Sequence, residues 1–589
     1  MNRFLILLMI AVFSVSSCNE QTKKEVVIDQ NEEFDSFKDE FLQELWKQSP
    51  GWASWAGLHD YDSILNVNSA ESRQQLLASN TGLSTKLHSF ELGNLDDGNK
   101  IDYHLIQNFI DTEEWYLSDF KSYEWDPSNY NVAGRVWTIM NGTYADLDTR
   151  LDILSSLLEK VPAFYEAATD NLKKPTMEHL ILGLNQNKGG LGMLGDGLMD
   201  SIASSTLSDT KKELLRTRVT SSKEAVNNYI STLENLKGSF DSASATSPRI
   251  GKELFDKKYE LEINSDYTAE QIYNKALEEK AALHVQMIVI TDTLWDKYLV
   301  DVAKPADKII MVKTLIDKIA EKHVSRENFF EEINRQIPVL AAFVEENDLL
   351  TQDPSKPLVV RETPLYMRGG GSGASVSSPG PYEKGKDTYY NVTPLDGYND
   401  EEAESYLREY NHYILQILNI HEGIPGHYTQ LIYGNQSPSI IKSILGNGAM
   451  IEGWANYAEI MMLEEGYNNS PEMWLMRGKW HLRGVTNTIL DYSYHVLNLE
   501  KQDAMKLMIV DAFQEQTEAE NKWRRVTLSS VQLSSYFTGF SQIYELREEL
   551  KEKKGDLFNL KEFHEQFLSY GNAPVRHIRE LMLKEDSEL

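Results

Sequence analysis

The stretch that decides the interpretation of this chain is His421-Glu422-Gly423-Ile424-Pro425-Gly426-His427. It places two imidazoles and a carboxylate close together at the end of a long amphipathic segment. A metal hydrolase needs neutral histidines to hold Zn²⁺, an open position for water, and a nearby carboxylate that accepts the proton of that water. The stretch contains all of these residue types, so it predicts half of a zinc site.

The spacing of the two histidines requires a break in the helix. In the common His-Glu-x-x-His pattern the histidines lie on one face of a helix. His421 and His427 are six residues apart, which would place them roughly 120° apart around an ideal helix. Pro425 has no N–H and its ring clashes with the carbonyl of His421, while Gly426 accepts unusual backbone angles. We therefore predict a distorted turn that brings His427 back towards His421.

A third ligand is expected from a neighbouring helix. Glu452 and Glu459 lie in the largely apolar segment 451–459, where a charge needs a partner. They share one helix face, so they either compete or act as a ligand and the hydrogen-bond partner of a ligand. We favour Glu452 as the ligand, because Gly453 beside it would allow close helix packing. Glu422 is adjacent to a predicted ligand and is the predicted general base.

Five further residues are candidates for contacts with a substrate. Tyr536, His481 and His495 would donate to a developing oxyanion. Arg524 and Arg525 would clamp a substrate carboxylate. The alternative is that the histidines and the tyrosine are ordinary core or surface groups, and that the adjacent arginines are solvated.

Composition limits the classes of partner. The chain has 589 residues with 58 basic and 90 acidic side chains, a formal net charge of −32, which makes nucleic acid an unsuitable partner. Hydrophobic residues make up 41% of the chain, enough for a large core, so the protein is globular rather than a disordered acidic chain.

The first residues have the order of a lipoprotein signal peptide. A basic start, an apolar run over residues 4–13 and then Val15-Ser16-Ser17-Cys18 resemble a bacterial signal that ends in a lipobox. Cys18 is the only cysteine, so we predict that residues 1–18 are the signal, that Cys18 is lipidated, and that the polar residues 19–33 are a flexible tether. The protein would be exported and held in the bacterial cell envelope, on the outer membrane, only through this lipid. The alternative is an ordinary signal peptide with an incidental cysteine.

Residues 34–589 are expected to form one large helical domain, or two lobes around a cleft. Apolar residues recur at helical spacing over the segments 34–46, 151–172, 211–236, 308–319, 401–419, 446–466, 471–497, 501–512, 518–552 and 560–568. Thr268 and Gln271 form a capping box that opens a further helix, which is predicted to end near Tyr298.

A short β region interrupts the helices. Residues 358–363 and 389–393 have the composition of strands, and the Gly- and Ser-rich residues 368–380 between them are expected to be a flexible flap. The glycine run lacks the ending of a phosphate-binding loop, which argues against a nucleotide site. The strands matter because zinc peptidases hold an extended substrate along a strand edge beside the metal.

Residues 421–430 and 452–459 resemble the bacterial family named for domain of unknown function 885, whose members carry similar His-Glu-x-x-Pro-Gly-His and Glu-Gly-Trp-Ala-x-Tyr-Ala-Glu segments. The likeness covers most of the chain, including residues 49–59, 491–495, 536–539 and 563–564. The resemblance implies a mainly α, zincin-like fold of the gluzincin type, with a small sheet near an active-site cleft. Residues 536–540 are also similar to the segment that carries the transition-state tyrosine of angiotensin-converting-enzyme-like peptidases.

The leading hypothesis is a zinc peptidase that hydrolyses short peptides. His421, His427 and Glu452 would hold Zn²⁺, Glu422 would deprotonate water, and Tyr536 would stabilise the oxyanion. The alternative from another class is a non-catalytic surface lipoprotein that binds glycans or peptides for uptake. A third possibility keeps the metal and hydrolyses another amide or an ester. Stoichiometric zinc in the purified protein would separate the binding hypothesis from the other two.

Overall fold

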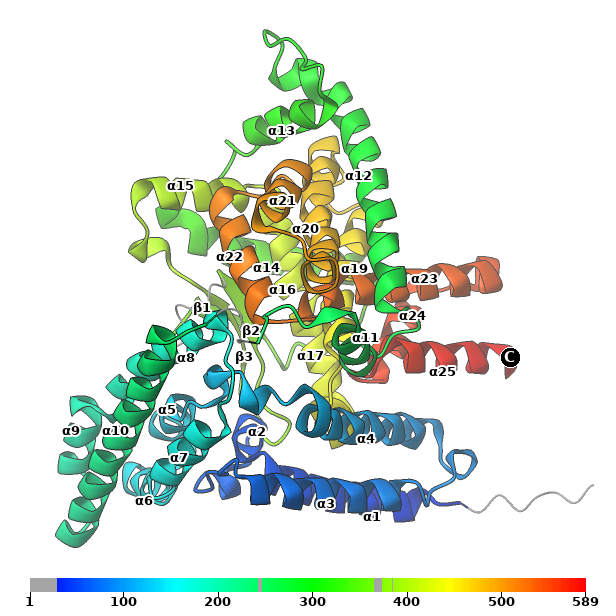
Figure 1. Ribbon diagram of the computed structural model, residues 1–589. Helices are drawn as coiled ribbons and strands as arrows, with labels where there is room; N and C mark the ends of the chain where they lie inside the picture. Colours follow the sequence, from blue (N-terminus) through cyan, green and yellow to red (C-terminus); the bar gives the residue numbers. More distant parts are fainter. Residues whose placement is uncertain (1–28, 242–245, 365–372, 384, 589) are drawn as a thin grey trace, which may run out of the picture.

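The computed structural model describes residues 29–241, 246–364, 373–383 and 385–588. The predicted signal peptide, Cys18 and the first part of the predicted tether lie outside these residues. The first helix begins at Asn31, so the end of the segment 19–33 is helical. The described chain is mainly α with one three-stranded sheet, which confirms the predicted fold class (Figure 1). Among the described helices, none has the length and hydropathy needed to cross a bilayer.

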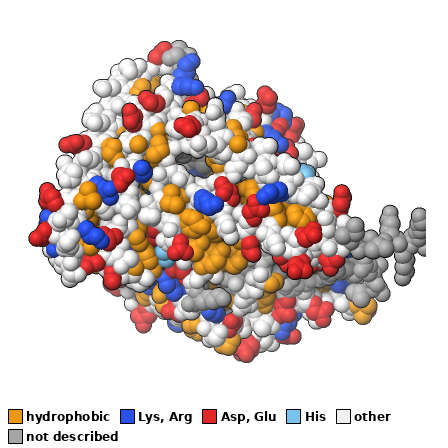
Figure 2. Space-filling view, turned by 90° about the horizontal axis from the view of Figure 1, so that it is seen from below, with side chains coloured by type: hydrophobic (Ala, Val, Ile, Leu, Met, Phe, Trp, Pro, Cys, Tyr) orange, Lys and Arg blue, Asp and Glu red, His pale blue; other side chains and the backbone are white. Residues whose placement is uncertain are grey.

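Four N-terminal helices form the base of the molecule in Figure 1. They are α1 (Asn31–Gln48), α2 (Pro50–Trp55), α3 (Ala70–Leu87) and α4 (Asp97–Trp115). Helix α1 buries Phe34, Phe37, Phe41 and Leu45, whose spacing of three and four residues places them on one face. Seen from below, this part of the surface mixes acidic and basic side chains around a central group of hydrophobic ones (Figure 2).

The next helices enclose a hydrophobic core of their own. They are α5 (Ala133–Asn141), α6 (Leu147–Leu158), α7 (Val161–Asn171), α8 (Met177–Gly190), α9 (Asp196–Ser204) and α10 (Asp209–Gly238). The prediction of one helix over 151–172 was wrong, because the chain breaks between α6 and α7. Pro162 lies in the first turn of α7, where its missing N–H costs nothing, whereas inside one long helix it would remove a hydrogen bond.

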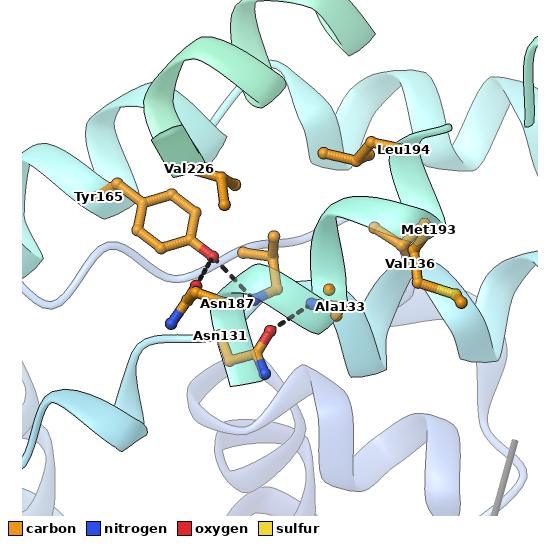
Figure 3. Close-up of a pocket in the computed structure, with 10 residues that line it drawn as sticks. Asn131, Ala133, Val136, Tyr165, Asn187, Met193, Leu194 and Val226 are labelled. Carbon is orange, nitrogen blue, oxygen red and sulfur yellow. Dashed lines mark hydrogen bonds between the residues drawn. The ribbon is translucent and has the colours of Figure 1, made fainter. Parts of the chain in front are cut away.

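This second core contains a cavity of about 10 Å³, which has room for about one water molecule (Figure 3). The hydroxyl of Tyr165 donates to Asn187 Oδ1 over 2.8 Å at its edge. The cavity is a packing gap and is too small for an organic ligand.

Helices α11 (Gly251–Glu262), α12 (Ala269–Tyr298), α13 (Lys308–Ile319) and α14 (Phe329–Glu346) lead to the sheet. The capping box of Thr268 and Gln271 is present, and α12 ends at Tyr298 as predicted. Helix α13 has the predicted bounds, because its apolar repeat is bounded by a side-chain cap from Asp307.

The sheet consists of β1 (Leu358–Glu362), β2 (Ala374–Ser377) and β3 (Thr388–Val392) in the order β1-β3-β2. Strand β3 pairs in parallel with β1 and antiparallel with β2. The expectation of a flap over 368–380 was wrong at residues 374–377, which form β2. The hydroxyl of Tyr390 on β3 donates to Asn419 Oδ1 over 2.8 Å, and this contact fixes the sheet against the helix that carries His421.

The C-terminal half of the chain supplies the centre of the main core. Its helices are α15 (Asp400–Glu409), α16 (Ile414–Glu422), α17 (His427–Gln436), α18 (Ile440–Ile444), α19 (Gly448–Glu464), α20 (Pro471–His495), α21 (Lys501–Lys506), α22 (Gln516–Leu528), α23 (Ser535–Lys554), α24 (Leu560–Ser569) and α25 (Val575–Glu588). Helices α16 and α19 are buried on nearly all sides, and buried polar side chains on them, such as Asn419 and Glu459, have hydrogen-bond partners.

Two long helices predicted in this half are split by buried side chains that capture backbone N–H groups. In the segment 518–552, the carboxylate of Asp491 accepts from the N–H groups of Val531 and Ser534 over 3.1 Å each, and the chain turns between α22 and α23. In the segment 401–419, the side-chain oxygen of Asn411 accepts from the backbone N–H groups of Tyr413 and Ile414, and the chain turns here between α15 and α16. Such capture replaces helical hydrogen bonds at a new helix start.

Candidate metal centre

The helix that carries His421 ends at the predicted position. Helix α16 stops at Glu422, a turn follows, and α17 starts at His427. A side chain on Gly426 would place its Cβ 2.0 Å from the carbonyl oxygen of His421, so only glycine fits there. The predicted break of the helix is therefore confirmed.

Tryptophan from α19 holds this turn in place. The indole N–H of Trp454 donates to the carbonyl of Pro425 over 2.9 Å, and the Trp454 side chain is fully buried. The turn is thereby attached to the helix that carries Glu452, so the two histidines and the carboxylate are positioned by one packed unit.

Helix α19 lies unusually close to α23 because both carry glycine at the contact. A Cβ on Gly453 would lie 2.4 Å from the backbone carbon of Gly539, and a Cβ on Gly539 would lie 1.7 Å from the carbonyl oxygen of Ala449. These distances leave no room for a methyl group on either helix. The close approach predicted at Gly453 is present, and it sets the position of the neighbouring Glu452.

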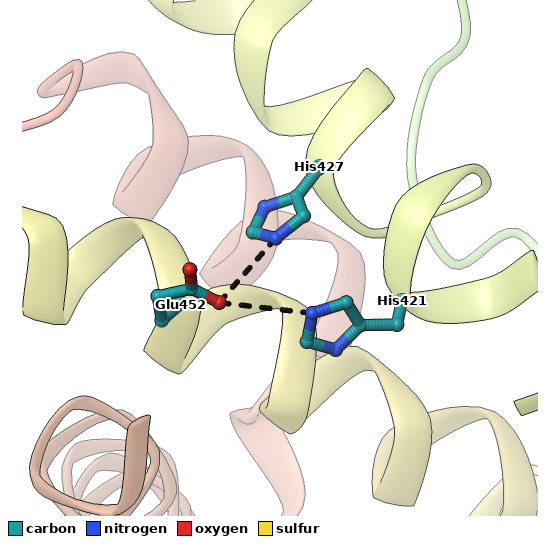
Figure 4. Close-up of side chains that lie close together, drawn as sticks. All are labelled: His421, His427 and Glu452. Atoms are coloured by element: carbon teal, nitrogen blue, oxygen red, sulfur yellow. Dashed lines mark ion pairs between the residues drawn. The ribbon is translucent and has the colours of Figure 1, made fainter. Parts of the chain in front are cut away.

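The side chains of His421, His427 and Glu452 converge (Figure 4). One potential ligand atom from each lies within 4.8 Å of the other two. Glu452 Oε2 is 3.7 Å from His421 Nε2 and 3.5 Å from His427 Nε2. The two imidazole rings are 4.7 Å apart between centroids and nearly perpendicular, at 84°.

These spacings suit a zinc ion. Two ligands at zinc–nitrogen or zinc–oxygen distances of about 2.1 Å with tetrahedral angles lie about 3.4 Å apart, close to the two distances made by Glu452 Oε2. Two histidines and one carboxylate also leave a fourth position open, which is typical of catalytic zinc sites. The residues present therefore fit the metal that the sequence predicts.

Glu459 orients the first histidine. Its Oε1 accepts from His421 Nδ1 over 2.8 Å and from the indole N–H of Trp480 over 3.0 Å. A carboxylate on Nδ1 fixes the tautomer that presents Nε2 to the cluster and makes that nitrogen a better ligand. Of the two predicted carboxylates, Glu452 is thus the one in the ligand group and Glu459 is the one behind His421.

The grouped charges perturb one another. Burial lowers the pKa of His421, but hydrogen bonds and charge from Glu452 and Glu459 more than offset it and raise the pKa to about 10. Burial favours the neutral form of Glu452, yet hydrogen bonds with His421 and His427 hold its pKa well below the ordinary value. The centre therefore favours a proton or a cation between these groups.

Glu422 lies next to the cluster. Burial raises its pKa, and the charges of His427 and His421 offset part of that rise. A carboxylate whose pKa is raised towards neutrality is a stronger base than an exposed one. Its position and its environment both suit the predicted general base.

Tyr536, in the first turn of α23, is close enough to Glu452 to feel its charge. Burial, and then the charge of Glu452, raise the pKa of Tyr536, so the hydroxyl stays protonated and able to donate. Arg525 Nη2 donates to this hydroxyl over 3.2 Å, and both Arg525 and Arg524 are exposed at the surface. Arg525 therefore lies beside a candidate oxyanion donor.

The two other histidine candidates lie outside the ligand group. His481 Nε2 is 3.2 Å from Glu279 and its ring packs on Phe540. His495 Nε2 is 3.0 Å from the carbonyl of Ser529, and burial lowers its pKa to about 4. Their contacts give no support to the predicted role as oxyanion donors, because each is engaged in packing between helices.

Sequence reasoning missed Trp454 and Trp480. The indole N–H of Trp454 donates to the carbonyl of Pro425, and that of Trp480 donates to the carboxylate of Glu459. The two residues lie on α19 and α20, away in sequence from residues 421–427. A signal was available for Trp454, which lies two residues after the predicted ligand Glu452, since a buried indole N–H needs an acceptor.

A family model and two solved structures match most of this chain. A structure of a putative lipoprotein of unknown function from Shewanella oneidensis is 50% identical, with a TM-score of 0.88, and the match covers 93% of this chain and 99% of that one. The putative lipoprotein from Colwellia psychrerythraea has the same fold at 18% identity, with a TM-score of 0.77 over 95% of this chain and 100% of that one. No curated protein matches. The family model for bacterial proteins of unknown function, DUF885, matches residues 50–582. The chain therefore belongs to the DUF885 family.

Proposed function

We propose that this protein is a zinc-dependent hydrolase that cleaves short peptides. The observation that carries the proposal is the convergence of His421 Nε2, His427 Nε2 and Glu452 Oε2 beside the half-buried Glu422. Bound by these three residues, zinc would supply a Lewis acid that polarises the scissile carbonyl and the attacking water.

The remaining chemistry belongs to the protein. Glu422 accepts the proton of the attacking water at its carboxylate and returns it to the leaving amine. The hydroxyl of Tyr536 donates to the oxygen that gains charge from the carbonyl. Glu459 keeps the proton on His421 Nδ1, so that Nε2 stays available to the cation.

The position of the sheet supports an extended substrate. Within the described residues, β1 is an edge strand, and Leu358 at its start lies 3.4 Å from the Cβ position of Gly423 in the turn that joins the histidines. An edge strand presents unpaired N–H and C=O groups that pair with an extended peptide. A peptide on this edge would run beside the metal centre.

Two relatives described as putative lipoproteins support a lipid anchor at Cys18 and a place in the cell envelope, with the outer membrane as the proposed site. This part of the proposal is independent of catalysis. It rests on the lipobox-like residues 15–18.

The test of the catalytic proposal compares the wild type with Glu422→Gln in metal analysis and in peptide-library cleavage. The variant keeps the volume of the side chain and removes the base, so we expect bound zinc to be retained and hydrolysis to fall by roughly 10²–10⁴-fold. Undiminished hydrolysis by the variant would overturn the mechanism. A wild-type protein that binds zinc but cleaves only other amides or esters would overturn the substrate class alone.

A further inference from the structure

A second cavity lies where α12, α19, α20 and α23 meet, and its volume is about 460 Å³. That volume falls within the range of small-molecule sites. None of the three proposed zinc ligands lines it. Its lining is mixed: one part is apolar and aromatic, with contributions from Leu283, Met287, Ile460, Trp474, Phe537 and Phe540, and the other part carries charged and polar side chains.

Arg477 lines this cavity and is only 7% exposed. Its Nε and Nη2 atoms are buried and have no hydrogen-bond partner among the described residues. The guanidinium lies 5.7 Å from the ring of Phe540, which offers a cation–π contact but accepts no hydrogen bond in the plane of the guanidinium. An unpaired buried donor of this kind is costly, and more so when it is charged.

The other charged groups around the cavity have partners. Lys275 is 2.9 Å from Glu545. Glu464 is 2.6 Å from Arg547, and Glu279 is 3.2 Å from His481, as described above. Arg477 is therefore the lining cation that lacks an ion pair within the described part of the chain.

Ser541 adds a second unpaired group to the same cavity. The residue is 3% exposed, and its hydroxyl has no hydrogen-bond partner among the described residues. A serine hydroxyl and a guanidinium both donate to a carboxylate, and a guanidinium does so through two parallel N–H groups. These donors, together with the apolar part of the lining, match a ligand with one anionic end and an apolar body.

We propose that this cavity binds a small organic carboxylate with an aromatic or branched apolar body, held by Arg477 and Ser541. The apolar part of the lining takes the body of the ligand, and the two side chains take its carboxylate. This binding site is separate from the proposed zinc centre and does not depend on zinc chemistry.

The experiment measures binding of 3-phenylpropionate to the purified protein by calorimetry, with the neutral 3-phenylpropanamide as the matched probe. We expect the carboxylate to bind once per chain and at least tenfold more tightly than the amide. Arg477→Met should weaken binding of the carboxylate by roughly ten- to hundredfold, because a charge-assisted contact is lost. Ser541→Leu should also weaken it, because leucine narrows the cavity and removes a donor.

His427→Ala separates this site from the metal centre, where a carboxylate could also bind. We expect this variant to bind 3-phenylpropionate as the wild type does. Loss of binding in His427→Ala with retention in Arg477→Met would place the ligand at the metal centre and overturn the proposal. Absence of binding to the wild type, or equal affinity for acid and amide, would overturn it as well. If Arg477→Met does not fold, as judged by thermal unfolding, the acid–amide comparison and Ser541→Leu decide.

Discussion

Replacing Gly453 by alanine tests whether the close approach of two helices positions the metal centre. The added Cβ would lie 2.4 Å from a backbone carbon of Gly539, whereas ordinary contacts begin near 3.4 Å. Because backbone atoms cannot rotate away, α19 and α23 must separate by about 1 Å. Such overpacking typically costs about 1–3 kcal/mol of stability.

The same displacement should affect the metal. Glu452 precedes Gly453 on α19, and its Oε2 is 3.5 Å from His427 Nε2. A shift of about 1 Å is large compared with the tolerance of a metal site, which is about 0.5 Å. We expect zinc affinity to fall by at least about tenfold, which is the effect of disturbing the support of a metal ligand.

The assay is competition with a chelator for zinc, together with thermal unfolding of the metal-free protein. Gly448→Ala is the matched control, since a Cβ at Gly448 in the same helix meets nothing within 4 Å. The control should bind zinc as the wild type does. If Gly453→Ala also binds zinc with wild-type affinity, the helix contact does not position Glu452 and the reasoning is refuted.

Four further outcomes are expected. Tyr536→Phe should retain zinc and lower kcat by roughly 10²–10³-fold by loss of an oxyanion donor, whereas Tyr544→Phe, whose hydroxyl contacts Glu464, should leave peptide cleavage unchanged. Glu459→Gln should weaken zinc binding by roughly 10–100-fold in chelator competition; an unchanged affinity would show that the charge behind His421 is not needed. Burial lowers the pKa of His564 to about 4, so between about 6.5, its unfolded pKa, and about 4 the unfolded chain binds more protons than the folded one. The stability that this residue contributes is therefore lost as pH falls through that range. Chemical denaturation at several pH values should show that the free energy of unfolding falls less steeply with falling pH in His564→Gln than in the wild type. Cys18→Ala should move the protein from the detergent phase to the aqueous phase on Triton X-114 separation; a variant that still enters the detergent phase would argue against lipidation at Cys18.

Local chemistry was sufficient to predict the features that depend on neighbouring residues. Pro425 and Gly426 required a break, and the helices on both sides end and begin where these residues demand. Gly453 indicated a close helix contact because it stands beside a candidate ligand in an apolar segment. The capping box at Thr268 defined a helix start for the same local reason.

Features that depend on distant residues could not be predicted in this way. The break between α22 and α23 is imposed by Asp491, which lies on another helix and captures the N–H groups of Val531 and Ser534. The bond from Trp480 to Glu459 likewise joins two helices. Periodicity records which face of a helix is buried, but it does not identify the polar partner that the face will meet.

Zinc content measured by elemental mass spectrometry tests the central claim most directly. The three-residue centre predicts about one zinc ion per chain in the wild type and almost none in His427→Ala, with His481→Ala, outside the ligand group, as the histidine control that keeps its zinc. A wild-type protein that neither contains zinc nor can be loaded with it would contradict the account, as would a His427→Ala variant with undiminished zinc.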